Sequence, residues 1–89
     1  MSIESVNCCI KNPKGIHCRV ATKIAEIVSA HDSVVQLKAE NGQVDCSSIL
    51  DILSLALLQD SQVVVTADGA DARTVLKALK SLLARTDDP

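Results

Sequence analysis

The chain has 89 residues, which allows one domain and one hydrophobic core but little room for a deep, enclosed pocket. It contains no Phe, Tyr or Trp and has a formal net charge of −2, so it lacks the aromatic surfaces and broad positive charge that nucleic-acid-binding domains use. No apolar run approaches the about 18 residues of a membrane-spanning helix, and the N-terminus does not resemble a signal peptide. We expect a single cytoplasmic domain over residues 1–89 that binds neither nucleic acid nor a membrane.

The first third of the chain predicts a strand, a loop and a helix. Apolar and polar side chains alternate over residues 4–10, which is typical of a half-buried strand. Pro13 and Gly15 then interrupt the pattern and indicate a loop. Residues 18–29 carry apolar side chains at helical spacing, so one face of this helix should pack on the core.

The middle of the chain predicts a hairpin and a second helix. Residues 33–39 have the composition of a strand, and Asn41-Gly42 favours a tight two-residue turn into a short strand over residues 43–46. Residues 48–58 have a helical pattern, and Ser48 is a suitable capping residue for the start of this helix.

The last third predicts a fourth strand over residues 61–67 and a helix from Ala70 onward. The final four residues are expected to fray, which leaves an ordered core over about residues 4–84. The resulting order is βαββαβα. It favours an α+β fold in which a four-stranded antiparallel sheet carries three helices on one face.

The helix predicted over residues 48–58 has more apolar side chains than one buried face needs. Helical spacing places Ile49, Ile52, Leu53 and Ala56 on the buried face. Leu50 and Leu57 must then point elsewhere. An exposed apolar patch on a small protein often marks a binding site for a partner, although a loop or the last helix could also cover it.

The four cysteines, Cys8, Cys9, Cys18 and Cys46, match no zinc-binding spacing. In a cytoplasmic chain they should stay reduced and behave as small apolar residues. We therefore expect no metal site and no cofactor.

His17 lies where the first predicted helix begins, among the basic residues Lys11, Lys14, Arg19 and Lys23. The first N–H groups of a helix have no internal partner, and the helix dipole adds positive charge, so this position favours an anion. Arg19 could add a guanidinium suited to phosphate oxygens, and a neutral imidazole is nucleophilic near pH 7. This combination favours reversible phosphoryl transfer on His17. The alternative is that His17 only caps the helix or faces solvent; His31, after the helix, is assigned no function.

Three segments resemble the histidine-containing phosphocarrier (HPr) family of the phosphoenolpyruvate-dependent sugar phosphotransferase system. GIHCRVA at 15–21 resembles the family segment around the phosphorylated histidine, SSILDILSL at 47–55 resembles a second family segment, and ADGAD at 67–71 resembles the start of the family's last helix. The spacing between the three blocks fits without large gaps. The resemblance covers about residues 4–84 and implies the family fold, an open-faced β-sandwich.

The resemblance implies a phosphocarrier and not an enzyme. His17 would accept a phosphoryl group on Nδ1 from Enzyme I, with Arg19 beside it, and pass it to the A domains of sugar permeases. The second helix would dock these partners through Ile49, Leu50 and Leu53. The family fold also implies a monomer.

Ser48 has two possible roles. The resemblance matches it to a serine that a dedicated HPr kinase/phosphorylase modifies in some members. In this chain, however, Ser47 replaces the family lysine and Asp51 replaces a glycine, and Asp51 would repel a phosphoserine one turn away. Val20 also replaces the family proline after the arginine. These departures leave open an alternative function, a regulatory HPr-like module of the nitrogen-related or serine-phosphorylated kind with no role in sugar transport.

Overall fold

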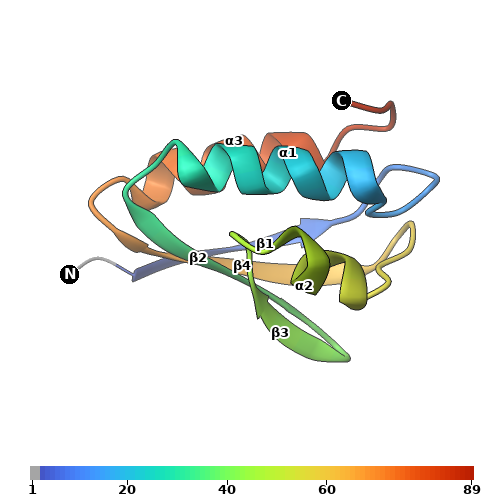
Figure 1. Ribbon diagram of the computed structural model, residues 1–89, viewed down its shortest axis with the longest axis horizontal. Coiled ribbons are helices and arrows are strands. Elements are labelled where there is room, and N and C mark those ends of the chain that lie inside the picture. The colour runs from blue at the N-terminus through green and yellow to red at the C-terminus, as the bar shows by residue number, and fades with distance from the viewer. Residues whose placement is uncertain (1–2) are drawn as a thin grey trace.

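The computed structural model describes residues 3–89, and its elements follow the predicted βαββαβα order (Figure 1). The strands are β1 (Ile3–Cys9), β2 (Ser33–Ala39), β3 (Gly42–Asp45) and β4 (Gln62–Gly69). The helices are α1 (Cys18–Ser29), α2 (Ile49–Ser54) and α3 (Ala72–Leu83). Within residues 3–89, no helix has the length and apolar character needed to cross a membrane.

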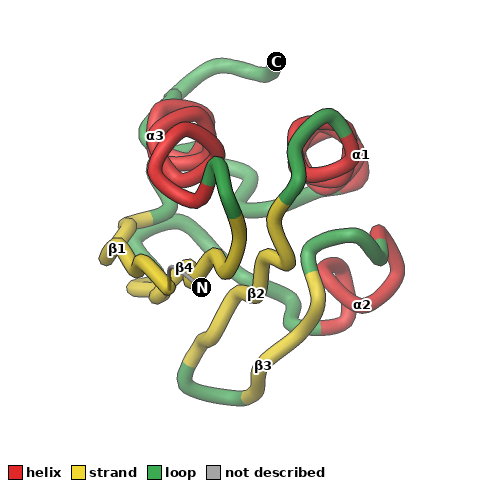
Figure 2. Tube along the Cα trace, turned by 90° about the vertical axis from the view of Figure 1, so that its left-hand side faces the viewer, coloured by secondary structure: helices red, strands yellow, loops and turns green. Residues whose placement is uncertain are grey.

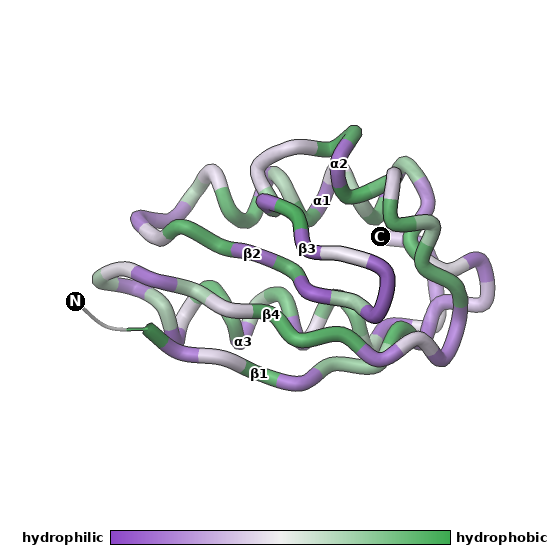
Figure 3. Tube along the Cα trace, turned by 90° about the horizontal axis from the view of Figure 1, so that it is seen from below, coloured by the Kyte–Doolittle hydropathy of each residue, from purple (hydrophilic) through white to green (hydrophobic). Residues whose placement is uncertain are grey.

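The four strands form one antiparallel sheet in the order β1-β4-β2-β3. Helices α1 and α3 lie side by side over one face of this sheet, and the short α2 packs against α1 and β3 (Figure 2). Over residues 3–89 the other face carries no helix, and it is the face nearest the viewer in Figure 3. The predicted α+β fold with an open-faced sheet is confirmed.

The hydrophobic core lies between the sheet and the two long helices. In α1 the apolar stripe Val20, Ile24 and Val28 is buried, as the helical spacing predicts. Alternate residues of the strands meet it, and Val35 and Val65 are at most 1% exposed. Burial of each such side chain contributes about 1.5–3 kcal/mol to stability. Helix α1 is therefore held firmly on the sheet, and so is His17, the residue that precedes it.

Helix α2 is shorter than the helix predicted over residues 48–58. Its last helical residue is Ser54, and Ala56 has a positive φ of 51°, which ends the helix. The change of direction exposes Ala56 and buries Leu57, so the prediction was wrong for both side chains. The carbonyl of Leu57 then accepts a hydrogen bond from the N–H of Ile16 at 3.0 Å. The segment after α2 thus supports the loop that leads into α1.

Asp71 joins the turn before α3 to the turn before β2. Its carboxylate accepts hydrogen bonds from the hydroxyl of Ser33 and from the backbone N–H of Asp32. These bonds, of which the one from Ser33 has the larger effect, lower the pKa of the Asp71 carboxyl. The ionised carboxylate therefore stabilises the folded chain.

Replacing Asp71 with asparagine is expected to destabilise the fold in a pH-dependent way. Because the pKa of Asp71 is lower in the folded than in the unfolded chain, its contribution is complete above the unfolded value of about 4. It is lost as the pH falls through the folded pKa. The difference in free energy of unfolding between wild type and Asp71→Asn should therefore be constant near neutral pH and shrink below about pH 4.

Urea unfolding between about pH 7 and pH 2.5 measures this difference. Asp51→Asn is a suitable control, because it removes one charge from an exposed carboxylate with no side-chain hydrogen bond among residues 3–89. A difference for Asp71→Asn that is independent of pH would contradict the prediction.

Candidate functional site

His17 is the N-cap residue of α1. Its backbone is extended, and its carbonyl accepts the first hydrogen bond of the helix from the N–H of Ala21 at 2.9 Å. Its ring folds over the helix terminus, where Nδ1 accepts a hydrogen bond from the backbone N–H of Arg19 at 3.2 Å. The side chain is 25% exposed. Nδ1 therefore lies at the positive end of the helix dipole, where an attached anion is stabilised.

The loop before α1 is held by Asn12, the one buried polar residue of the described chain. Its side-chain oxygen accepts from the N–H of Lys14, and its carbonyl accepts from the N–H of Gly15, both at 2.8 Å. This turn brings Lys14 to the same side as His17. These bonds, with the one from the N–H of Ile16 to the Leu57 carbonyl, hold the loop that carries His17 in place.

The C-terminal tail folds back over the start of α1 instead of fraying as predicted. The carboxylate of Asp88 accepts a hydrogen bond from Nε2 of His17 at 2.8 Å and one from the side-chain amide of Asn12 at 3.1 Å. It also pairs with Arg19 at 3.2 Å and Lys14 at 3.5 Å. The hydrogen bonds from Asn12 and His17, with the charge of Lys14, hold the pKa of the Asp88 carboxyl well below its usual range.

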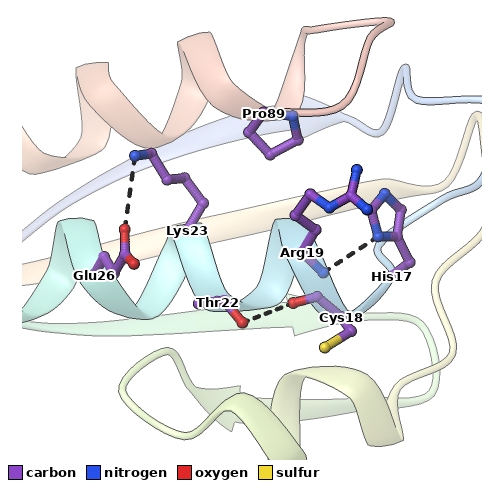
Figure 4. A pocket seen from close by; sticks show the side chains of 7 residues that line it. All are labelled: His17, Cys18, Arg19, Thr22, Lys23, Glu26 and Pro89. Atoms are coloured by element: carbon purple, nitrogen blue, oxygen red, sulfur yellow. Dashed lines mark hydrogen bonds and ion pairs between the residues drawn. The ribbon is translucent and has the colours of Figure 1, made fainter.

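A shallow pocket opens along α1 next to His17 (Figure 4). Its lining residues are His17, Cys18, Arg19, Thr22, Lys23, Glu26 and Pro89. The guanidinium of Arg19 lies beside the imidazole in this view, and the ring of Pro89 lies above α1 near Arg19 and Lys23. Arg19 and Lys14 have side chains 66% and 71% exposed, so both remain accessible to an anion at the imidazole.

Exposed apolar side chains lie on α2 and on the segment after it. Leu50 is 79% exposed and Leu58 is 70% exposed. Ile49 and Leu53 are partly buried against the core, so of the three predicted docking residues Leu50 presents the most surface. Leu58 follows the residue whose carbonyl bonds to the loop before His17, and its backbone lies beside Gly15 of that loop. Ser48 caps α2, and its hydroxyl accepts from the N–H of Asp51 at 3.3 Å.

All four cysteines are free thiols, and they differ in exposure. Cys18, next to His17, is exposed, whereas Cys8 and Cys46 are buried. Burial, with the negative charge of Asp45, raises the pKa of the Cys46 thiol to about 12, and burial also raises the pKa of Cys8. Cys8 and Cys46 therefore serve the core and are protected from reaction.

We expect iodoacetamide at about pH 8 to modify Cys18 at least about 100-fold faster than Cys8 or Cys46, which must first be uncovered by unfolding. Peptide mass spectrometry over a time course measures the ratio. The same reaction in urea should modify all four thiols at similar rates. Early modification of Cys46 in the folded protein would contradict the assignment of this thiol to the core.

His31, the second histidine, lies away from the cluster at the other end of α1. Its Nδ1 is 2.6 Å from the carbonyl of Ile27. Because a carbonyl only accepts, Nδ1 of His31 must carry the hydrogen. The two histidines thus have opposite arrangements: Nδ1 accepts a hydrogen bond in His17 and donates one in His31.

The structure brings together His17 and Arg19, which were predicted from their spacing, and adds Asn12 and Asp88, which were not. Asn12 had a weak signal, since asparagine in a Pro- and Gly-containing loop often forms such a turn. Asp88 had none, because it reaches the site from 71 residues away along the chain. Among residues 3–89, no group of His, Cys, Asp and Glu side chains is arranged to hold a metal ion.

The chain is similar to known proteins in both sequence and fold. The family described as the PTS HPr component phosphorylation site matches residues 5–85. The phosphocarrier protein HPr of Mycoplasma genitalium is 36% identical over 75 residues, which are 83% of this chain and 85% of that protein. The crystal structure of HPr-C-His from Thermoanaerobacter tengcongensis has a TM-score of 0.84 at 32% identity and covers 90% of both chains. The phosphocarrier protein HPr from Bacillus anthracis str. Ames shares the fold, with a TM-score of 0.87 at 22% identity, over 93% of this chain and 99% of that one.

Proposed function

The chain belongs to the HPr family, the phosphocarrier proteins of the phosphotransferase system, and from this premise we propose that His17 carries the phosphoryl group. In this proposal Nδ1 of His17 accepts the group from phosphorylated Enzyme I and passes it to the A domain of a sugar permease. The observation that carries the proposal is the hydrogen bond from the N–H of Arg19 to Nδ1. Because an N–H can only donate, this bond requires that Nδ1, at the start of α1, carries a lone pair and not a hydrogen.

The transfer step follows from this geometry. The lone pair of Nδ1 attacks phosphorus, a nitrogen–phosphorus bond forms, and the bond from phosphorus to the donor breaks with its electron pair. The N–H of Arg19, which now bonds to Nδ1, becomes free to donate to a phosphoryl oxygen. The guanidinium of Arg19 and the ammonium of Lys14 supply positive charge for the remaining oxygens.

Like the phosphocarrier proteins of its family, the protein would act as a carrier between a donor and an acceptor and not as an enzyme. The site suits this role, since the imidazole lines a shallow surface pocket where a donor and then an acceptor can reach it. The apolar residues Ile49, Leu50 and Leu53, with Leu58, would dock these partners next to His17. We place this monomeric carrier in the cytoplasm, where its thiols would stay reduced.

Ser48 bears on the alternative function. Its hydroxyl already caps α2, and Asp51 lies one turn away, where its charge would oppose a phosphoserine. A kinase that phosphorylates Ser48 would have to overcome both effects. The main proposal therefore rests on His17 alone, and a serine-phosphorylated regulatory module is an outcome that the experiment distinguishes.

The test is a two-stage transfer. Purified protein is incubated with phosphoenolpyruvate and Enzyme I, and intact-mass spectrometry should show one added phosphoryl group that is lost in acid. The charged protein is then mixed with a panel of permease A domains, and at least one should accept the group. Charging without transfer to any permease domain would favour the regulatory alternative, and absence of charging would refute the carrier function.

A further inference from the structure

Asp88 makes the shortest polar contact of His17, from a part of the chain that no motif includes. Its Oδ1 lies 2.8 Å from Nε2 of His17, and its side chain is 25% exposed. The buried amide of Asn12 bonds to the same oxygen at 3.1 Å. The carboxylate is thus held in place by the same residue that builds the His17 loop.

The two neighbours of the imidazole specify one tautomer. On one side a backbone N–H, which can only donate, points to Nδ1, so Nδ1 must carry the lone pair. On the other side an ionised carboxylate, which can only accept, faces Nε2, so Nε2 must carry the hydrogen. The two contacts are independent, and they agree.

We infer that Asp88 is a positioning residue for phosphoryl transfer: its carboxylate holds His17 as the Nε2–H tautomer and so keeps the lone pair on Nδ1, the nitrogen that accepts the phosphoryl group. This inference rests on the proposed carrier function of His17. It assigns a role to the C-terminal tail.

The charge that develops during transfer strengthens the role of Asp88. When the neutral imidazole forms a bond to phosphorus through Nδ1, it keeps the hydrogen on Nε2, and the ring becomes cationic. A carboxylate 2.8 Å from Nε2 stabilises this cation as the bond forms. When the phosphoryl group leaves, the electron pair of the nitrogen–phosphorus bond returns to Nδ1 and the starting tautomer is restored without any proton exchange.

His31 has a different hydrogen-bond partner, a backbone carbonyl. Its Nδ1 donates to the Ile27 carbonyl, so this nitrogen has no free lone pair in the neutral ring. His31 is therefore an internal reference with the opposite tautomer.

Asp88 also pairs with Lys14 and Arg19, and this suggests a competing role. The carboxylate could occupy the anion site and delay the incoming phosphoryl group. The contact with Nε2 favours positioning, because the phosphoryl group attaches to Nδ1 on the other side of the ring. The two roles predict opposite effects of removing the carboxylate, since loss of a blocking group would speed charging.

The first readout of the test is the tautomer itself. In full-length protein with ¹⁵N-labelled histidine, at a pH where the imidazole is neutral, His17 should show Nε2 as the protonated nitrogen and His31 should show Nδ1. In Asp88→Ala the two nitrogen signals of His17 should move towards each other, because the tautomers exchange. Those of His31 should not change.

The second readout is the rate of charging by Enzyme I and phosphoenolpyruvate. Asp88→Ala should be charged about tenfold more slowly than wild type, as expected for loss of a charge-assisted hydrogen bond. Asp87→Ala is the matched control: it removes the same charge one residue away, from an exposed carboxylate that pairs with Arg85. It should leave both readouts at wild-type values.

Both readouts must change in Asp88→Ala for the inference to stand. An unchanged tautomer, an unchanged rate or faster charging would each overturn it. A wild-type protein that accepts no phosphoryl group would reject the proposed function instead, and the nitrogen signals would still decide whether Asp88 sets the tautomer.

Discussion

Replacing His17 with alanine is expected to abolish phosphoryl transfer while the protein remains folded. At the start of α1, Nδ1 of His17 supplies a nitrogen lone pair, which accepts a hydrogen bond from the N–H of Arg19 on a side chain that is 25% exposed. Without it, Arg19 and Lys14 can attract an anion but cannot form a bond to phosphorus. Intact-mass spectrometry after incubation with phosphoenolpyruvate and Enzyme I should show no added group.

The matched control is His31→Ala, which removes the other imidazole of the chain. It should be charged like wild type, because Nδ1 of His31 is engaged by a backbone carbonyl far from the site. The circular dichroism of His17→Ala should match that of wild type, and its unfolding midpoint should fall only slightly. The variant loses the N-cap bond from Arg19, at about 1 kcal/mol, and the contact of Nε2 with Asp88, whose carboxylate keeps Asn12, Lys14 and Arg19 as partners. Charging of His17→Ala to the wild-type level would contradict the assignment.

Replacing Gly15 with alanine is expected to have the largest effect on both stability and transfer outside His17 itself. Gly15 has a φ of +68°, which costs a residue with a Cβ about 1–2 kcal/mol. An added Cβ would lie 2.2 Å from the carbonyl oxygen of Leu57, a backbone atom that cannot move without shifting the loop. We expect a loss of about 2–4 kcal/mol in the free energy of unfolding.

The same change should displace the imidazole. The Leu57 carbonyl that meets the new Cβ also holds the N–H of Ile16, the residue before His17. Movement of this carbonyl therefore moves the N-cap of α1. The charging rate of folded Gly15→Ala should fall by about tenfold or more, because small displacements of reacting groups are costly.

Gly42→Ala separates the two effects. Gly42 also has a positive φ, but its added Cβ would meet only a side-chain methyl of Leu55, at 3.3 Å, in the β2–β3 turn. This variant should lose stability, by about 1 kcal/mol, and keep the wild-type charging rate. Urea unfolding and the charging assay measure both quantities. A normal charging rate in Gly15→Ala would show that the loop does not position His17.

Local patterns predicted most of the fold. The bounds of α1 at residues 18 and 29 followed from its apolar stripe, and Asn41-Gly42 located the β2–β3 turn because few other pairs tolerate its backbone angles. The end of α2 could not be predicted this way. Ala56 adopts a positive φ that its side chain does not favour, and tertiary contacts of Leu57 compensate for it. The helical spacing of apolar residues continues to residue 58, whereas the helix itself ends at Ser54.

The candidate site also has a part that the sequence predicts and a part that it does not. His17 and Arg19 are two residues apart at a helix terminus, so their joint chemistry could be read from spacing. Asp88 lies in a short acidic tail whose composition favours fraying, and its position depends on Asn12, Lys14 and Arg19 all pointing to one place. No local sequence pattern predicts that residues so far from Asp88 along the chain will meet at its carboxylate. The partner of the Nε2 nitrogen was therefore visible only in three dimensions.

The most direct test of phosphoryl transfer on His17 is to observe the bond to phosphorus. Protein with ¹⁵N-labelled histidine is charged by Enzyme I and phosphoenolpyruvate, and ³¹P–¹⁵N coupling identifies the nitrogen that carries the group. We predict a single phosphorus signal coupled to Nδ1 of His17, with the hydrogen retained on Nε2. Coupling to Nε2, to either nitrogen of His31, or a phosphorus signal from Ser48 in place of histidine would contradict this account.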